Sequence, residues 1–137
     1  MAATFKGEFA KSTGAATASQ SVTGLGWVPD ALLFWGTIQT AYGSINSDMC
    51  TFVGMAARIG GTTQYSICSC APDGGGSGLD NRSHSTKAIN IIAINSTTVI
   101  AECDISSWDS DGFTLSWTTN NAVAYKIHFF AWTGLTN

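Results

Sequence analysis

The residues with the strongest intrinsic chemistry in this chain are its four cysteines, Cys50, Cys68, Cys70 and Cys103. Cys68 and Cys70 are two positions apart, so on a β-strand both thiols lie on the same side. A structural zinc site usually combines two pairs with the spacing C-x₂₋₄-C or H-x₃₋₅-H, and this chain has one pair at a different spacing. Free cysteine packs as a small hydrophobic residue. We expect core packing, with a disulfide from Cys68 or Cys70 as the alternative and metal binding as a third.

The oxidation state of these cysteines depends on where the chain folds. The N-terminal segment MAATFKGEFAKSTG lacks the apolar stretch of a signal peptide, which predicts synthesis in a cytoplasm, where the cysteines stay as thiols. The longest apolar run, 31–35, is far shorter than the roughly 20 residues of a membrane-spanning helix. We therefore expect no membrane as a partner.

General base catalysis would have to use one of two histidines, His84 and His128. Neither is accompanied by a serine in the context of a nucleophile elbow. His128 falls on the opposite side of its predicted strand from Ile127 and Phe129. We expect it to lie at the surface or in a subunit contact.

Carboxylates offer two further sites. Glu102 and Asp104 share one side of a predicted strand about 7 Å apart, a separation compatible with the carboxylate pair of a glycosidase, although a solvent-facing strand is the more ordinary interpretation. Asp109-x-Asp111-Gly resembles the start of a calcium loop, but no glutamate closes the loop and a hairpin turn is expected. These patterns together predict no enzymatic activity, no cofactor and no metal.

Five tryptophans are many for a chain of 137 residues. Trp35 and Trp117 lie in apolar alternation, which predicts core positions. Trp27, in a loop before a proline, and Trp108, beside Asp109, are better candidates for a ligand or protein contact, with packing over the ends of the fold as the alternative. The candidate contact residues are therefore Trp27, Trp108 and His128.

The composition restricts the class of partner. Hydrophobic residues make up 45% of the chain and charged residues only 11%, with a net charge of −3. The six basic residues are scattered, which argues against binding to nucleic acid. Ser, Thr, Asn and Gly supply a neutral polar surface that tolerates close packing of many copies, as in virion coats, fibres and carbohydrate-binding proteins.

Period-two alternation recurs along the chain and predicts one all-β domain over residues 1–137, an antiparallel β-sandwich, jelly-roll-like, with about eight strands. Residues 31–36 form a nearly continuous apolar run that predicts a strand buried on both sides. Gly60-Gly61 predicts a tight hairpin turn, and residues 113–132 a closing hairpin. Residues 72–78 (PDGGGSG) should be the most flexible stretch. The predicted strands span residues 4–10, 20–23, 31–36, 49–59, 62–70, 85–93, 98–105, 113–117 and 123–132.

Two segments carry a resemblance to a known class of protein. Residues 20–36 (QSVTGLGWVPDALLFWG) and 107–134 (SWDSDGFTLSWTTNNAVAYKIHFFAWTG) resemble jelly-roll decoration or cement proteins, and related head and fibre modules, of tailed bacteriophages. The resemblance implies a virion component without catalytic residues, made in the host cytoplasm and often assembled as a trimer on the outside of the capsid.

The leading hypothesis is therefore a phage capsid decoration protein that forms a homo-oligomer, with the major capsid protein as its partner. The alternative is a carbohydrate-binding or receptor-binding module of a tail fibre, which would use an exposed Trp27 or Trp108. A small glycosidase that uses Glu102 and Asp104 is the third hypothesis.

Overall fold

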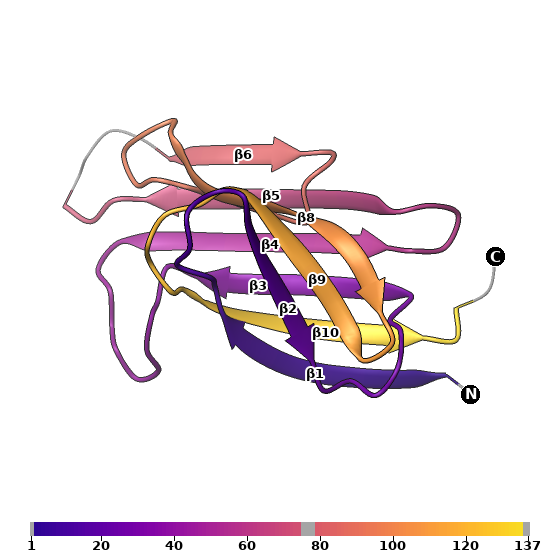
Figure 1. Cartoon of the computed structure of the whole chain (residues 1–137). Coiled ribbons are helices and arrows are strands. Elements are labelled where there is room, and N and C mark those ends of the chain that lie inside the picture. The colour runs from indigo at the N-terminus through magenta and orange to yellow at the C-terminus, as the bar shows by residue number, and fades with distance from the viewer. Residues whose placement is uncertain (1, 75–78, 136–137) are drawn as a thin grey trace.

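The computed structural model describes residues 2–74 and 79–135, which form ten β-strands (Figure 1). Residues 75–78, part of the segment predicted to be most flexible, lie outside the described residues. No described residue belongs to a helix that is long and apolar enough to cross a membrane. The strands are β1 (Ala3–Ala10), β2 (Ala18–Thr23), β3 (Ala31–Thr37), β4 (Met49–Ala57), β5 (Thr63–Ala71), β6 (Asp80–His84), β7 (Ile89–Ile92), β8 (Val99–Asp109), β9 (Gly112–Thr119) and β10 (Lys126–Thr133).

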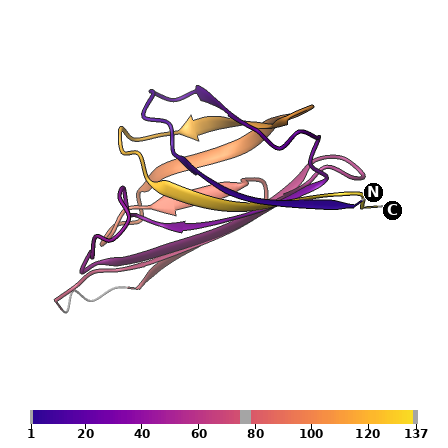
Figure 2. The ribbon, with the colours of Figure 1, turned by 90° about the horizontal axis from the view of Figure 1, so that it is seen from below.

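The strands form two antiparallel sheets that pack face to face, which confirms the predicted all-β sandwich. The larger sheet has six strands in the order β1-β10-β3-β4-β5-β6, and the smaller has four in the order β2-β9-β8-β7. The strands of the smaller sheet cross the larger one at an angle (Figure 1), and a view turned by 90° shows the sheets as separate layers (Figure 2).

The core lies between the two sheets and is built from alternate residues of each strand. On β9, Phe113, Leu115 and Trp117 are all fully buried, as their alternation predicts. The Phe113 ring lies 5.6 Å from the ring of Phe34 on β3 and 5.4 Å from that of Phe129 on β10, between ring centroids. These aromatic contacts join the two sheets, because β9 belongs to one sheet and its two partners to the other.

Glycine is required at two places in this arrangement. A Cβ atom on Gly54, in the middle of β4, would lie 1.8 Å from the carbonyl oxygen of Ala88. The segment that leads into β7 therefore crosses directly over β4 at this point. Gly60 and Gly61, with φ of 79° and 103°, form the turn between β4 and β5, as predicted.

Two sequence predictions differ from the structure. The edge strand β6 is not predicted, because residues 80–84 (DNRSH) show no apolar alternation, and the strand expected at 85–93 is confined to β7. The predicted closing hairpin over residues 113–132 is wrong, since β9 pairs with β2 and β8 while β10 pairs with β1 and β3. Residues 120–125 instead cross from one sheet to the other.

Candidate interaction surface

The outer side of the six-stranded sheet is the most unusual surface of the molecule. The register places the outward residues in rows that run across the strands, one with Phe130, Leu33, Met55 and Tyr65 and the next with His128, Trp35, Val53 and Ile67. Met55, Tyr65 and Ile67 expose 51%, 55% and 54% of their surfaces, and Trp35 exposes 37%. We call this apolar surface the outer face and define it by the following residues: Leu33, Trp35, Val53, Met55, Tyr65, Ile67, His128, Phe130 and Trp132.

Charge is confined to the margin of the outer face. The outward residues of β3, β4 and β5, three strands that the structure describes in full, include no Asp, Glu, Lys or Arg. Lys6 and Glu8 are exposed on the edge strand β1, opposite Phe130 and His128 of β10. A surface with an uncharged aromatic, Met and aliphatic centre and charges at its rim has the composition of a protein–protein interface.

The run at 31–36 is therefore not buried on both sides, as its sequence predicts. Leu32 and Phe34 point into the core and are buried, whereas Trp35 lies on the outer face and is exposed. The prediction that Trp35 is a core residue is wrong, because Trp35 is exposed in a single copy of the chain. The apolar side chains that led to it have no covering element among the described residues.

The three predicted contact residues occupy different environments. His128 lies on the outer face, 4.0 Å from the Glu8 carboxylate, with its ring stacked on Trp35 at 5.7 Å between centroids. Trp27 and Trp108 are partly buried against the core, and the Trp108 indole nitrogen donates a hydrogen bond to the Thr62 hydroxyl. Both tryptophans thus pack in part against the core, whereas Trp35 is exposed, and the contact role of Trp27 and Trp108 stays a prediction.

A groove of ≈ 330 Å³ adjoins the outer face where the loop between β3 and β4 returns. Its walls include the rings of Trp35, Tyr42 and His128, and Tyr42 is 58% exposed. Gln39 and Ser44 add polar atoms, with the serine hydroxyl donating to the glutamine oxygen at 3.0 Å. An aromatic wall beside amide and hydroxyl groups can stack on a sugar ring and form hydrogen bonds with its hydroxyls.

The carboxylates proposed for glycosidase chemistry are both engaged in ion pairs. Glu102 lies 2.8 Å from a guanidinium nitrogen of Arg82, and Asp104 lies 2.8 Å from the ammonium of Lys87. Burial on its own would raise the pKa of Glu102, but the hydrogen bond and charge of Arg82 hold it below its usual value. A glycosidase needs one carboxylic acid with a raised pKa, and the shift of Glu102 has the opposite sign. Asp109 and Gly112 close the β8–β9 hairpin, as predicted.

The cysteines are all buried, and a disulfide joins Cys50 to Cys70. The prediction of four thiols is therefore wrong for these two residues, which lie directly opposite each other on β4 and β5. The alternative of a disulfide from Cys70 is the arrangement observed. Cys68 and Cys103 are thiols, and burial raises the pKa of each.

Two buried charges hold the ends of the sheets. The Lys11 ammonium donates to the carbonyl oxygens of Ser12 at 2.9 Å and Asn121 at 2.7 Å and to the Asn120 side chain, and burial lowers its pKa from 10.5 to about 8. Asp30 accepts hydrogen bonds from the Arg58 side chain and from the Gly134 backbone amide at 2.7 Å. Sequence reasoning missed both, because nothing in the spacing of Lys11 or Asp30 indicates a buried partner.

Comparison with known proteins gives no match to a family model, to a curated protein or to a solved structure. The fold is thus established by the structure, and the function has to be inferred from the site.

Proposed function

We propose that this protein is a non-catalytic structural module that assembles by burying its outer face against other copies of the same chain. The observation that carries the proposal is the uncovered apolar surface of the six-stranded sheet. Solvent-exposed apolar surface of this kind is unfavourable for an isolated chain and becomes favourable when a partner removes it from water.

The outer face has the size of the apolar centre of an interface. Its nine residues lie on four strands at a spacing of about 4.8 Å and in three rows about 6.8 Å apart, which gives a footprint of roughly 19 by 20 Å, or about 390 Å². Specific interfaces bury about 800 Å² per partner, and projecting side chains and the polar rim supply the remainder.

The charges at the rim favour a second copy as the occupant. Lys6 and Glu8 lie two positions apart on β1, so the edge carries one charge of each sign. Two symmetry-related copies of such an edge can pair a lysine of one with a glutamate of the other. The resemblance of residues 20–36 and 107–134 implies a trimer, and we propose one in which the three outer faces surround the threefold axis.

The setting that we propose is the virion of a tailed bacteriophage, as the resemblance of residues 20–36 and 107–134 implies. Both segments contribute to the face or its support: residues 31–36 lie in β3 and residues 126–133 form β10, two central strands of the larger sheet. In this role the trimer is a decoration protein on the capsid surface and the major capsid protein is its partner. The polar outward side of the smaller sheet is then free to contact solvent.

Native mass spectrometry and light scattering test the assembly. The wild type should have a mass three times 14.3 kDa at micromolar concentration. An Ile67→Lys variant places a charge within the outer face, on β5, and should be a monomer, since buried unpaired charges oppose association. Ser19→Lys, which adds the same charge to the exposed outer side of β2, is the matched control and should stay trimeric.

A monomeric wild type, or equal masses for the two variants, contradicts the assembly proposal. The virion setting is tested separately, by looking for the protein in purified particles of a phage that encodes it. Its absence from those particles contradicts the decoration role. The trimer is tested independently by the mass measurement.

The groove beside Trp35 and Tyr42 supports a second candidate, a carbohydrate-binding module. Tyr42→Ala removes a ring that is 58% exposed and contacts His128 and Lys126 of β10 at the surface. It should abolish glycan binding and change the melting temperature little. A glycan array on which the wild type and the variant bind equally, or on which neither binds, counts against this candidate.

A further inference from the structure

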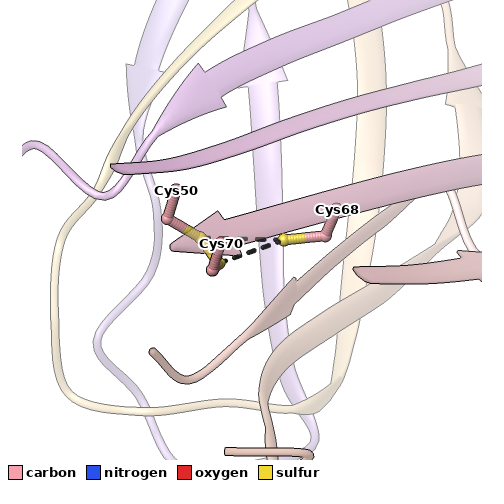
Figure 3. A group of neighbouring side chains, drawn as sticks. All are labelled: Cys50, Cys68 and Cys70. Atoms are coloured by element: carbon pink, nitrogen blue, oxygen red, sulfur yellow. Dashed lines mark hydrogen bonds between the residues drawn. A yellow bond between two sulfur atoms is a disulfide. The ribbon is translucent and has the colours of Figure 1, made fainter. Parts of the chain in front are cut away.

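Three of the four cysteines converge on one point inside the sandwich. Cys50 and Cys70 lie directly opposite each other on β4 and β5, and Cys68 is on the same side of β5 two residues before Cys70. All three are nearly inaccessible, with exposed fractions of 2%, 1% and 1%. Figure 3 shows the three sulfur atoms pointing toward one another.

The spacing of the sulfur atoms matches a metal site. The Cys68 sulfur lies 3.8 Å from those of Cys50 and Cys70, and all three lie within 4.8 Å of one another. Zinc binds thiolates at about 2.3 Å in a tetrahedron, which sets the separation of two ligand sulfurs at about 3.8 Å. The two distances between Cys68 and its neighbours therefore have the value that a shared tetrahedral ion requires.

A fourth ligand position faces the opposite sheet. The carbonyl oxygen of Ile92, at the end of β7, lies 3.5 Å from the Cys70 sulfur and 3.9 Å from the Cys50 sulfur. This oxygen is therefore in contact with two of the three sulfurs. Three sulfurs and one oxygen complete four-coordination without a water molecule, in keeping with the burial of the site.

We propose that the reduced form of the protein binds one Zn²⁺ ion through Cys50, Cys68 and Cys70, with the Ile92 carbonyl oxygen as the fourth ligand. The disulfide form cannot bind the ion in this way, because two of the three sulfurs are joined. The oxidised and reduced states thus hold the same strands together by different bonds, one covalent and one through a metal.

The chemistry of the conversion balances with a small thiol as the reductant. Two thiol molecules supply two electrons and two protons to the Cys50–Cys70 disulfide and leave as their own disulfide, giving two protein thiols. Zn²⁺ then replaces the protons of the three thiols, which pass to the buffer, and the bound unit carries one negative charge. Arg82, directly opposite Cys68 on β6, is the neighbouring cation, and it is also paired with Glu102.

The cysteine cluster lies near strand ends, where the reductant and the ion can reach it. Cys50 is the second residue of β4 and Cys70 the second to last of β5, and the neighbouring Met49 is 56% exposed. Terminal strand pairs open more readily than central ones, so the site is reached without unfolding the sheet.

Cobalt titration of the reduced protein tests the proposal. After reduction with a phosphine and removal of metals by a chelator, one equivalent of Co²⁺ should give sulfur-to-cobalt charge-transfer absorption and the visible bands of tetrahedral cobalt. One equivalent of Zn²⁺ should remove both. Zinc should also raise the melting temperature of the reduced protein by several degrees, because the fold holds the three sulfurs close together and zinc therefore binds the folded state more tightly than the unfolded chain.

Two variants distinguish the site from chance binding to thiols. Cys68→Ala keeps the pair that forms the disulfide and should weaken Co²⁺ binding at least 100-fold. Cys103→Ala removes the equally buried cysteine of β8, outside the cluster, and should bind one equivalent as the wild type does. Circular dichroism confirms that each variant is folded. A folded, reduced wild type without the cobalt bands, or the same bands in Cys68→Ala, overturns the proposal.

Discussion

The two sheets present very different outer surfaces. On the smaller sheet the outward residues of β2 and β9 are Ser and Thr, and the Ser21 and Thr114 hydroxyls are 2.9 Å apart. On the larger sheet the corresponding positions carry Leu, Trp, Val, Met, Tyr, Ile and Phe. Both sheets bury their inner sides against the same core, so the difference concerns only the surfaces that face outward.

This difference separates strands whose apolar side chains are all covered within the chain from strands that also expose apolar side chains. A strand that alternates apolar and hydroxyl residues, as β9 does, buries one side and solvates the other. β3 is apolar on both sides, a pattern typical of strands that are covered twice. β10 adds Phe130 and Trp132 to its outward side, beside Lys126 and His128. The chain supplies one cover, the smaller sheet, and we infer that a second copy supplies the other.

The largest expected effect comes from giving the outer face the character of the smaller sheet. The triple variant Leu33→Thr, Met55→Thr, Ile67→Thr places a β-branched residue at each of these strand positions, so the chain should still fold. Loss of three apolar contacts, at about 1.5 kcal/mol each, should weaken association about 1000-fold or more. Analytical ultracentrifugation over a concentration series measures the change.

The control for this variant introduces threonine at three outward positions of the smaller sheet, Ser19, Ser21 and Ser116. It should associate like the wild type. Equal weakening by both triple variants would mean that association does not depend on which face is altered, and the contrast between the two surfaces would have no bearing on assembly.

An effect of intermediate size is expected at Lys11, which supports the region where the chain crosses between the sheets. Lys11→Met preserves the length of the side chain but leaves the oxygens of Ser12, Asn120 and Asn121 without their donor. Unsatisfied buried acceptors of this kind should lower the free energy of unfolding by about 2–4 kcal/mol. Urea denaturation measures this, and Lys6→Met, on the exposed side of β1, should change it by less than about 0.5 kcal/mol.

The lowered pKa of Lys11 also predicts the direction in which stability changes with pH. The pKa of Lys11 is about 8 in the folded protein, and an unfolded lysine has a pKa of about 10.4. Between these values the unfolded chain holds the extra proton, so wild-type stability should rise with pH relative to Lys11→Met. A constant or shrinking difference from pH 8 to 10 would contradict the lowered pKa.

The sequence predicts the layers of this protein better than its surfaces. Alternation identifies the core side of β9 and β10 correctly, because burial on one side leaves a direct trace in residue type. The same logic assigns Trp35 to the core, since a pattern records that a residue is apolar and not which molecule covers it. The joining of Cys50 and Cys70 depends on the register of β4 and β5, which a spacing of 20 residues does not reveal. The spacing in the sequence also does not reveal that Cys68 and the Ile92 carbonyl oxygen both lie beside Cys70.

The smallest effect is expected at Asp30, which holds the end of the larger sheet without contributing to its outer face. Burial would raise the pKa of this carboxyl, but hydrogen bonds from Arg58 and from the backbone of Leu135 and Gly134 hold it below its usual value. Asp30→Asn keeps one oxygen acceptor and turns an N–H group toward these donors, so the free energy of unfolding should fall by about 1–2 kcal/mol at neutral pH.

The sign of the pH dependence follows from the lowered pKa of Asp30. A carboxyl with a lower pKa in the folded state stabilises the protein fully above its unfolded pKa of about 3.9, and this contribution disappears as the pH falls through the folded value. The wild type and Asp30→Asn should therefore differ by a constant amount above about pH 5 and converge below about pH 4. Asp73→Asn, at an exposed position, should follow the wild type. Because Asp30 lies inside the fold, its substitution should leave the oligomeric mass unchanged; a monomeric Asp30→Asn would mean that the end of the sheet, and not its outer face, holds the copies together.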